Sequence, residues 1–297
     1  MKILFTLLLL NMSIFSQEVE WQKVASDLNF PEGPAWNYDN TLFVSSCYGG
    51  FIAKIQNDSC TKLITASDNP FTLKQTNGLT ISRDGYIFAC EYGIGAILRI
   101  SQDGVSEIYS GGYNGTKFNR PNDIAFDQDG NVYFTDPKSY DPALPDGRVF
   151  RIDNKTKEVR VVAENIAFSN GLAFSPNGKY LFVCESAKNQ IIKFDVFPNG
   201  SLGERSVFIK LPGGDPDGIA FDVDGNLYAA HFGGGHIYVI SPEGNIIKKI
   251  KTPGKKPSNV EFCGPDLKTL YITEDETNSV YKTTVEVPGL KLFYSPD

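Results

Sequence analysis

Six polar residues recur along the chain at a nearly constant spacing, and each of them opens an apolar segment. Two are carboxylates and four are amides, and the steps between them are 45, 45, 48, 47 and 42 residues. This first ring consists of Glu32, Asn77, Asn122, Asn170, Asp217 and Asn259. Carboxylate and amide oxygens are the ligands that a hard cation such as calcium prefers, and calcium takes six to eight of them. If the fold brings these residues together, they can hold a divalent cation.

The segments that carry these residues are copies of one repeat. Its clearest copies are "PNDIAFDQDGNVYFTDP" from Pro121, "SNGLAFSPNGKYLFVCES" from Ser169 and "PDGIAFDVDGNLYAAHF" from Pro216, and weaker copies begin at Pro31, Thr76 and Ser258. A period of about 40–50 residues with several short strands per unit is typical of propeller blades. We therefore predict an all-β fold, a single-domain six-bladed β-propeller of four-stranded antiparallel blades over residues 17–297.

In a propeller the innermost strand of each blade lines the central channel, so the first ring should lie at one level of that channel. The alternative is that Asn-Gly and Asp-Gly pairs at three of these positions only form turns. Closure of the ring of blades requires the two ends of the chain to meet. We expect the strand-like "EVEWQKVAS" within residues 17–29 to complete the last blade near "LKLFYS", which removes exposed sheet edges.

A second polar series follows about fourteen residues after each first-ring residue, at the end of the next apolar segment. This second ring consists of Ser46, Glu91, Asp136, Glu185, His231 and Glu274. We hypothesise that its carboxylates, Glu91, Asp136 and Glu185 among them, accept hydrogen bonds from the ligand amides and orient them. The alternative is that these strand ends meet solvent. His231 would lie at the channel mouth, where an imidazole can bind substrate.

Charge and cysteine content exclude several kinds of partner. The formal net charge is −7, and no run of Lys or Arg marks a nucleic-acid or anionic-membrane surface. The five cysteines form no C-x-x-C pair, which argues against a zinc-thiolate site. Cys47 and Cys60 are the only two close in sequence; they form a disulfide or, alternatively, remain free thiols.

The first sixteen residues differ in composition from the rest. Lys2 precedes the apolar run from Ile3 to Leu10, and Ser13 and Ser16 follow. This layout is typical of a secretory signal peptide, here residues 1–16 with cleavage after Ser16. The apolar run is too short to span a bilayer, and a buried N-terminal strand is the alternative. We expect the protein to be secreted or periplasmic and to act as a monomer.

Four motifs resemble those of the gluconolactonase, regucalcin and luciferin-regenerating-enzyme family, most of all its bacterial gluconolactonase-like branch. They are "FPEGPAW" from Phe30, "NRPNDIAFDQDGNVYFTDP" from Asn119, "SNGLAFSPNGKYLFV" from Ser169 and "PDGIAFDVDGNLYAAHFGGG" from Pro216. The resemblance implies a six-bladed propeller with one catalytic divalent cation. Its metal ligands correspond to Glu32, Asn122, Asn170 and Asp217, and its substrate-binding residues to Arg120 and Asn122.

The expected reaction is hydrolysis of a small ester, above all a sugar lactone. The cation, calcium in the first place with zinc, magnesium or manganese as alternatives, would polarise the lactone carbonyl. Asp217 would accept the proton of the attacking water, and Glu32 would neutralise charge on the metal. Arg120, Asn77 and His231 would orient the substrate. The chain contains no Gly-x-Ser-x-Gly elbow of a serine esterase.

Three alternatives stay open at this point. A phosphotriester or aryl-ester hydrolase would use the same metal site, as the similarity of the ligand set to that of squid-type diisopropylfluorophosphatase implies. A non-enzymatic propeller would use its face as a binding module. A strictosidine-synthase-like protein would keep the fold but lack the Glu, Asn, Asn, Asp set.

Overall fold

A computed structural model describes residues 16–296 apart from residues 18 and 58. The predicted signal peptide, except for Ser16, lies outside the described residues. In the part of the chain that is described, no helix is long and apolar enough to cross a membrane.

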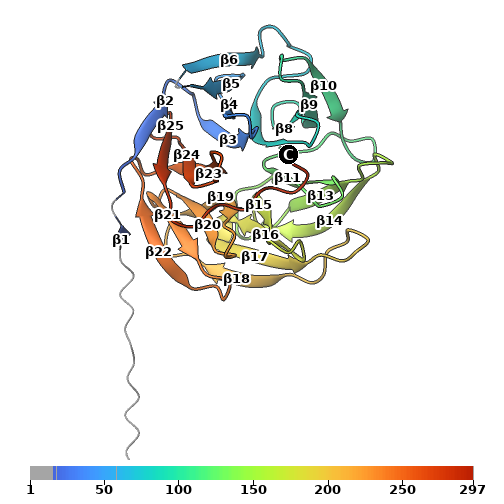
Figure 1. Ribbon diagram of the computed structural model, residues 1–297. Coiled ribbons are helices and arrows are strands. Elements are labelled where there is room, and N and C mark those ends of the chain that lie inside the picture. Colours follow the sequence, from blue (N-terminus) through green and yellow to red (C-terminus); the bar gives the residue numbers. More distant parts are fainter. Residues whose placement is uncertain (1–15, 18, 58, 297) are drawn as a thin grey trace, which may run out of the picture.

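Six antiparallel sheets surround a central channel, as predicted (Figure 1). Blade 1 contains β3 (Pro31–Trp36), β4 (Thr41–Ser46), β5 (Phe51–Gln56) and β6 (Ser59–Thr65). Blade 2 contains β7 (Thr76–Ile81), β8 (Ile87–Glu91), β9 (Ala96–Ile100) and β10 (Ser106–Ser110). Blade 3 contains β11 (Ile124–Phe126), β12 (Val132–Asp136), β13 (Gly147–Ile152) and β14 (Val159–Ile166).

The second half of the disc repeats this plan. Blade 4 contains β15 (Ser169–Phe174), β16 (Tyr180–Glu185), β17 (Gln190–Asp195) and β18 (Ser206–Lys210), with a 3-10 turn η1 (Ser186–Lys188) after β16. Blade 5 contains β19 (Asp215–Phe221), β20 (Leu227–Phe232), β21 (His236–Ile240) and β22 (Ile246–Lys251), and β1 (Ser16–Gln17) pairs in parallel with β22. Blade 6 contains β23 (Pro257–Cys263), β24 (Thr269–Glu274), β25 (Ser279–Thr284) and β2 (Gln22–Ala25).

The N-terminal segment completes the last blade, as the sequence predicts, but its partner differs from the predicted one. β2 pairs antiparallel with β25, whereas "LKLFYS" forms no strand. Instead the chain after β25 turns back across one end of the channel (Figure 1). There the Leu290 N–H donates to the Phe221 carbonyl and the Leu292 N–H to the Tyr38 hydroxyl.

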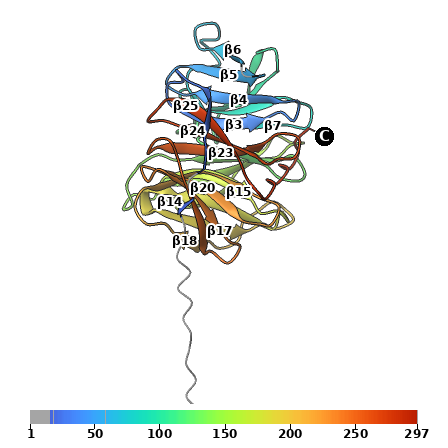
Figure 2. The ribbon, with the colours of Figure 1, turned by 60° about the vertical axis from the view of Figure 1, so that its left-hand side comes forward.

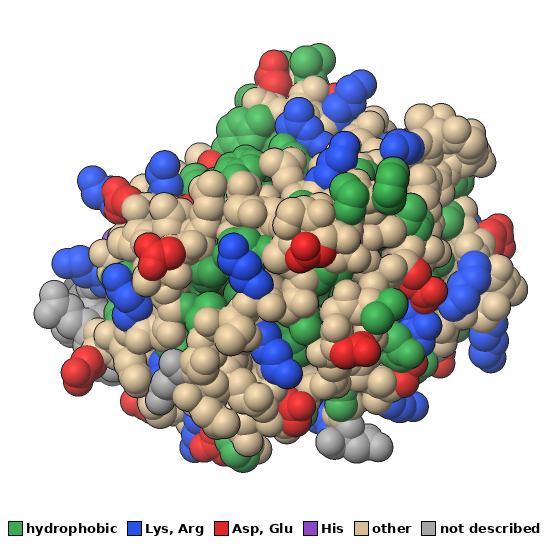
Figure 3. Space-filling model, turned by 90° about the horizontal axis from the view of Figure 1, so that it is seen from above, with side chains coloured by type: hydrophobic (Ala, Val, Ile, Leu, Met, Phe, Trp, Pro, Cys, Tyr) green, Lys and Arg blue, Asp and Glu red, His purple; other side chains and the backbone are tan. Residues whose placement is uncertain are grey.

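The apolar residues form six clusters, one between the facing sheets of each pair of neighbouring blades. Figure 2 shows the blades from a second direction. A strand of an inner layer therefore has both faces covered. This explains why inner strands such as β3 and β7 are buried at every position, while outer strands such as β6 are largely exposed. On the outer edge seen in Figure 3, acidic and basic side chains are interspersed.

Candidate functional site

The first ring lies where the chain enters the innermost strand of each blade. All six side chains are buried, with exposed fractions between 3% for Glu32 and 8% for Asn170 and Asp217. The inner strands contact one another around the channel, so these six residues surround it at one level. The structure thus brings together the four predicted metal ligands and Asn77, which was predicted to bind substrate.

Glycines after four first-ring residues allow this convergence. A Cβ atom on Gly33 would lie 2.4 Å from the Asn77 carbonyl oxygen, and one on Gly171 would lie 2.1 Å from that of Asp217. Gly78 and Gly218 approach the next blade in the same way, against Asp123 and Asn259. The β-pairing also shifts register at these positions, as in a bulge, which re-aims side chains. These glycines therefore serve close packing between blades, and the alternative that they only form turns is wrong.

The two first-ring carboxylates are in an environment that disfavours their negative charge. Burial and the nearby charge of Asp123 raise the pKa of Glu32 to about 8. Burial and the charge of Glu32 raise the pKa of Asp217 well above its usual range. A cation between buried, mutually repelling carboxylates removes both penalties.

A further carboxylate near this ring was not predicted. Asp275 directly follows the second-ring residue Glu274 in blade 6, which lies between the blades of Asp217 and Glu32. Its side chain is 8% exposed, and neither carboxylate oxygen has a hydrogen-bond partner among the described residues. Burial, followed by the charge of Glu32, raises its pKa to about 9. Its position one residue beyond the second ring was the only available sequence signal.

Asp123 is the second carboxylate that the sequence analysis missed. It follows Asn122 at the position that glycine occupies in four other blades, and it is buried. Its oxygens accept hydrogen bonds from Ile124 N–H (3.0 Å) and from Leu172 N–H of blade 4 (3.1 Å). Burial raises its pKa to about 6. The missing glycine could have drawn attention to it.

The second ring lies level with the first, as predicted. Pro31 pairs with Ser46, Thr76 with Glu91, Ser169 with Glu185, Pro216 with His231 and Pro257 with Glu274. The hypothesis about its hydrogen bonds is wrong. Among the described residues, the second-ring carboxylates accept hydrogen bonds from backbone N–H groups and side chains of their own blades, and none of these donors is a first-ring amide.

The same backbone contact recurs from blade to blade. Glu91 accepts from Lys74 N–H (2.7 Å), Asp136 from Arg120 N–H (2.8 Å), Glu185 from Ala167 N–H (2.9 Å) and Glu274 from Lys256 N–H (2.8 Å). Ser46 receives a bond from Asn29 N–H in the same way, at 3.1 Å. The second ring therefore fixes the loops from which the first-ring residues start.

Two predicted substrate-binding residues, His231 and Arg120, lie outside the first ring. His231 is 1% exposed, packs edge-on against Tyr238 at 4.7 Å between centroids, and neither ring nitrogen has a hydrogen-bond partner among the described residues. Burial lowers its pKa to about 4, so the ring is neutral at pH 7. His231 lies beside Pro216 in the second ring, with its side chain buried. Arg120 is exposed, with its guanidinium carbon 5.5 Å from the centroid of the Tyr92 ring.

The donor set fits a hard cation. In the described part of the chain, no group of three or more His, Cys, Asp or Glu side chains has the arrangement of a metal site. A site in the first ring would therefore combine the carboxylates of Glu32 and Asp217 with amide oxygens of Asn122 and Asn170. Such an all-oxygen set suits calcium, magnesium or manganese better than zinc, which prefers sulfur and nitrogen. Asp275 adds a further buried carboxylate close to Glu32.

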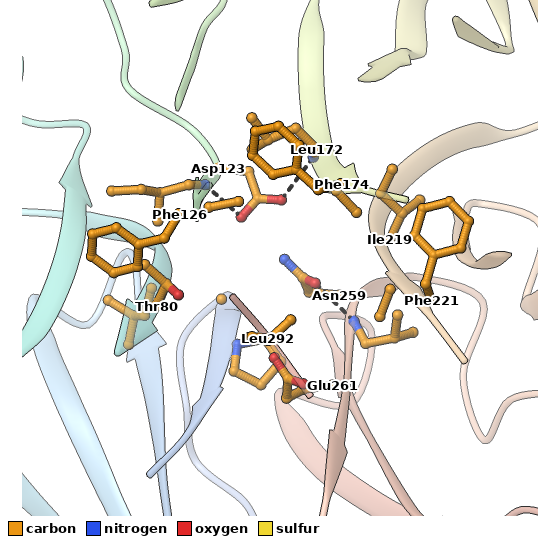
Figure 4. A pocket seen from close by; sticks show the side chains of 18 of the residues that line it. Thr80, Asp123, Phe126, Leu172, Phe174, Ile219, Phe221, Asn259, Glu261 and Leu292 are labelled. Carbon is orange, nitrogen blue, oxygen red and sulfur yellow. Dashed lines mark hydrogen bonds between the residues drawn. The ribbon is translucent and has the colours of Figure 1, made fainter. Parts of the chain in front are cut away.

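Below the first ring the channel continues as a cavity of about 70 Å³, shown in Figure 4. Its walls are mainly apolar, with Phe126, Phe174 and Phe221 among them, and Asp123 and Glu261 are its carboxylates. Leu290, Leu292 and Phe293 of the C-terminal segment close the far end. Access to the first ring is therefore from the opposite face, where the second ring lies.

The cysteines take no part in the site. All five are free thiols, and Cys60 is exposed while the others are buried. Cys47 and Cys60 form no disulfide, so the alternative of free thiols is correct. Burial raises the pKa of the Cys47 thiol, which keeps it protonated and unreactive.

The fold and this channel site define a six-bladed propeller with a buried carboxylate–amide ring. The family model described as "SMP-30/Gluconolactonase/LRE-like region" matches residues 30–275, and the chain belongs to this family. A gluconolactonase from Zymomonas mobilis is 30% identical over 281 residues, which cover 84% of this chain and 77% of that protein.

Other relatives carry related names. A 6-deoxy-6-sulfogluconolactonase from Pseudomonas putida is 33% identical over 159 residues, covering 48% of this chain and only 54% of that protein. Diisopropyl-fluorophosphatase from Loligo vulgaris is 30% identical over 234 residues, 73% of this chain and 74% of that protein. The structure of a gluconolactonase from Xanthomonas campestris superposes with a TM-score of 0.78 at 27% identity, covering 91% of this chain and 90% of that one.

Proposed function

We propose that this protein is an enzyme that hydrolyses a sugar lactone with the help of a divalent cation held in the first ring. The observation that carries the proposal is the pair of buried carboxylates, Glu32 and Asp217, in a ring with four amides. Burial and the charge of Glu32 together disfavour the negative charge of Asp217, and a cation between them would relieve this. The family relatives named gluconolactonase support the choice of substrate.

When bound, the cation supplies Lewis-acid polarisation of the substrate carbonyl and compensates the ring carboxylates. Glu32, Asn122, Asn170 and Asp217 would hold it, with Glu32 contributing mainly charge. Asp217, a buried carboxylate of the first ring, would accept the proton of the attacking water. The amide oxygens of Asn122 and Asn170 would help to orient the cation but carry no charge. The carboxylates therefore set the net charge of the site.

The residues around the first ring would orient the substrate and exclude water. Asn77 lies at the same level of the channel, and its side-chain amide could accept a hydrogen bond from a substrate hydroxyl or donate one to it. Arg120 on the exposed rim provides positive charge for the carboxylate that opens from a lactone. The closed lower end of the channel limits water to the side from which the substrate arrives.

A phosphotriester or aryl-ester hydrolase on the same ring is the second candidate, and the match to diisopropyl-fluorophosphatase favours it. A non-enzymatic binding module is the third. To separate them, metal-free protein is reloaded with calcium, magnesium, manganese or zinc and assayed on aldonolactones, aryl esters and phosphotriesters. Cation-dependent turnover of aldonolactones supports the proposal, whereas a preference for phosphotriesters selects the second candidate and no turnover at all selects the third.

Asp217→Asn keeps the shape of the side chain and removes its charge and basicity. We expect a loss of at least about 100-fold in kcat, the lower limit for removing a general base. Asp224→Asn, on an exposed hairpin turn of the same blade, is the matched control and should retain full activity. Substantial turnover by Asp217→Asn would refute the assignment of the base.

We further propose that the protein is exported, on the strength of Lys2 and the apolar run that follows it. N-terminal sequencing of the protein from periplasm or medium tests this, and a mature chain beginning near Gln17 is the expected result. An intact N-terminus in the cytoplasmic fraction would overturn it.

A further inference from the structure

Two Phe–Tyr pairs stand next to the channel mouth, on different sides of it. The rings of Phe30 and Tyr48 lie 4.7 Å apart between centroids, and those of Phe168 and Tyr140 lie 5.0 Å apart. The tyrosines are 51% and 55% exposed, so each offers an open ring surface to a ligand.

The phenylalanines occupy equivalent positions in opposite blades. Phe30 precedes the first-ring residue Glu32 by two residues, and Phe168 precedes Asn170 by two. Blades 1 and 4, to which they lead, lie across the channel from each other in the ring of six (Figure 1). The two pairs therefore flank the mouth from opposite directions.

Both phenylalanines have a backbone conformation that bulky residues avoid. Their φ angles are 59° and 58°, in the left-handed region, and the same loop contact holds each one. The Phe30 carbonyl accepts from Cys47 N–H at 3.0 Å, and the Phe168 carbonyl accepts from Ser186 N–H at 3.1 Å. At the corresponding positions of the other blades φ is not positive, at Gln75, Arg120, Asp215 and Pro257. Strained conformations of this kind concentrate at functional sites.

Charge interactions link both tyrosines to the ring. Burial raises the pKa of the Tyr48 hydroxyl, and the charges of Asp275 and Glu32 contribute. Burial also raises the pKa of Tyr140, with further contributions from its hydrogen bond with Asp215 and from the charge of Asp217. The backbone agrees with this placement: the Tyr48 N–H donates to the Asn29 carbonyl, three residues before Glu32, at 3.1 Å, and Tyr140 follows the second-ring residue Asp136 by four residues, so both tyrosines lie on the face where the second ring lies.

We propose that these two pairs form an aromatic clamp that binds the ring of a cyclic ester and so selects lactones over open-chain esters. The proposal rests on the proposed lactone hydrolysis. The C–H faces of a six-membered ring present an apolar surface that packs on aromatic rings, while its hydroxyls project from the edge. Phe232, whose ring centroid lies 6.3 Å from that of Phe30, extends the apolar surface on the first side. An open-chain ester has no such face and gains less from the clamp.

The test compares glucono-δ-lactone with methyl gluconate, the open-chain ester of the same acid. The variants are Tyr48→Ala, Tyr140→Ala and the ring-preserving Tyr48→Phe and Tyr140→Phe, with Val207→Ala on the exposed outer strand β18 as control. Each Ala variant should raise KM for the lactone by roughly 2- to 10-fold, the usual worth of one aromatic contact, and leave kcat unchanged. KM for methyl gluconate should not change. Tyr48→Phe should behave as the wild type.

Binding of glucono-δ-lactam, a ring analogue that is not hydrolysed, provides a readout that is independent of catalysis. Its dissociation constant should rise in the Ala variants by the same factor as KM, and thermal unfolding confirms that the variants are folded. Unchanged KM and lactam affinity in both Ala variants, or an equal loss on the lactone and on methyl gluconate, would overturn the clamp while leaving lactone hydrolysis in place. A wild-type protein that turns over neither ester would instead overturn the proposed function itself.

Discussion

A Cβ atom on Gly171 would lie 2.1 Å from the carbonyl oxygen of Asp217. The backbones of blades 4 and 5 are therefore in direct contact at the level of the first ring, with no side chain between them. Any side chain at residue 171 must push Asp217 away from its neighbours. The position of the proposed base is thus set by a residue of another blade.

Gly171→Ala should therefore weaken the fold and the site together. Overpacking of this kind costs about 1–3 kcal/mol, and displacement of Asp217 should lower cation affinity as well. Chemical denaturation and calorimetric titration with calcium measure the two effects. Gly111→Ala is the matched control, since its nearest neighbour would be 3.6 Å away. Equal behaviour of the two variants would show that the contact with Asp217 is unimportant.

Asp275 should destabilise the metal-free protein at neutral pH. Its pKa is 3.8 as a free group and about 9 in the folded chain, so the unfolded state loses the proton first as the pH rises. The stabilising contribution of this group to the free energy of unfolding is therefore fully present below about pH 4, and it decreases steadily as the pH rises to about 9.

Asp275→Asn removes that dependence. The metal-free variant should be more stable than the wild type at pH 7 by about 1–3 kcal/mol, the cost of one buried unsatisfied group, and the difference should vanish near pH 4. Urea denaturation of both proteins at several pH values measures it. A variant that is less stable at pH 7 would mean that the favourable interactions of the Asp275 carboxylate with Lys256 and Ser258 outweigh the cost of its burial.

The repeat in the sequence was sufficient to predict the six blades and the first ring, because the innermost strand must start at the same point of every blade. The pairing of β2 with β25 follows from the same need for closure. The role of the C-terminal segment did not follow, since "LKLFYS" has the composition of a strand and only the three-dimensional position of the channel end shows what it covers.

The surroundings of Asp275 and the second-ring hydrogen bonds could not be predicted from the sequence, for a different reason. Periodicity shows that a residue lies at a strand end but not toward which neighbour it points. Glu274 and Asp275 are adjacent and chemically alike, yet Glu274 binds the backbone of Lys256 and Thr277 while Asp275 remains without a partner among the described residues. The same holds for His231. Its place in the second ring predicted a side chain at the channel mouth, but not that the imidazole packs on Tyr238 and is buried.

Loading with a cation should stabilise the folded protein. A ligand at 100 times its dissociation constant adds about 2.7 kcal/mol when it binds only the folded state. Thermal unfolding of metal-free protein with increasing calcium should therefore show a rising Tm. Asp217→Asn should lose most of this rise and Asp224→Asn should keep it. A rise of the same size in both variants would place the cation outside the first ring.

Closure of the channel by the C-terminal segment should contribute to stability independently of the site. The Phe293 ring faces Phe174 at 6.2 Å between centroids and lines the cavity with Leu290 and Leu292. Phe293→Ala exposes this apolar surface, and since the ring is only partly buried we expect a loss of about 1–2 kcal/mol, below the 3–5 kcal/mol of a fully buried phenylalanine. Val105→Ala, at a position 68% exposed, should cost almost nothing. Calcium affinity should be equal in both variants, because the segment lies at the opposite end of the channel from the mouth. A Phe293→Ala protein with unchanged stability would show that the segment is not bound to the channel end in solution.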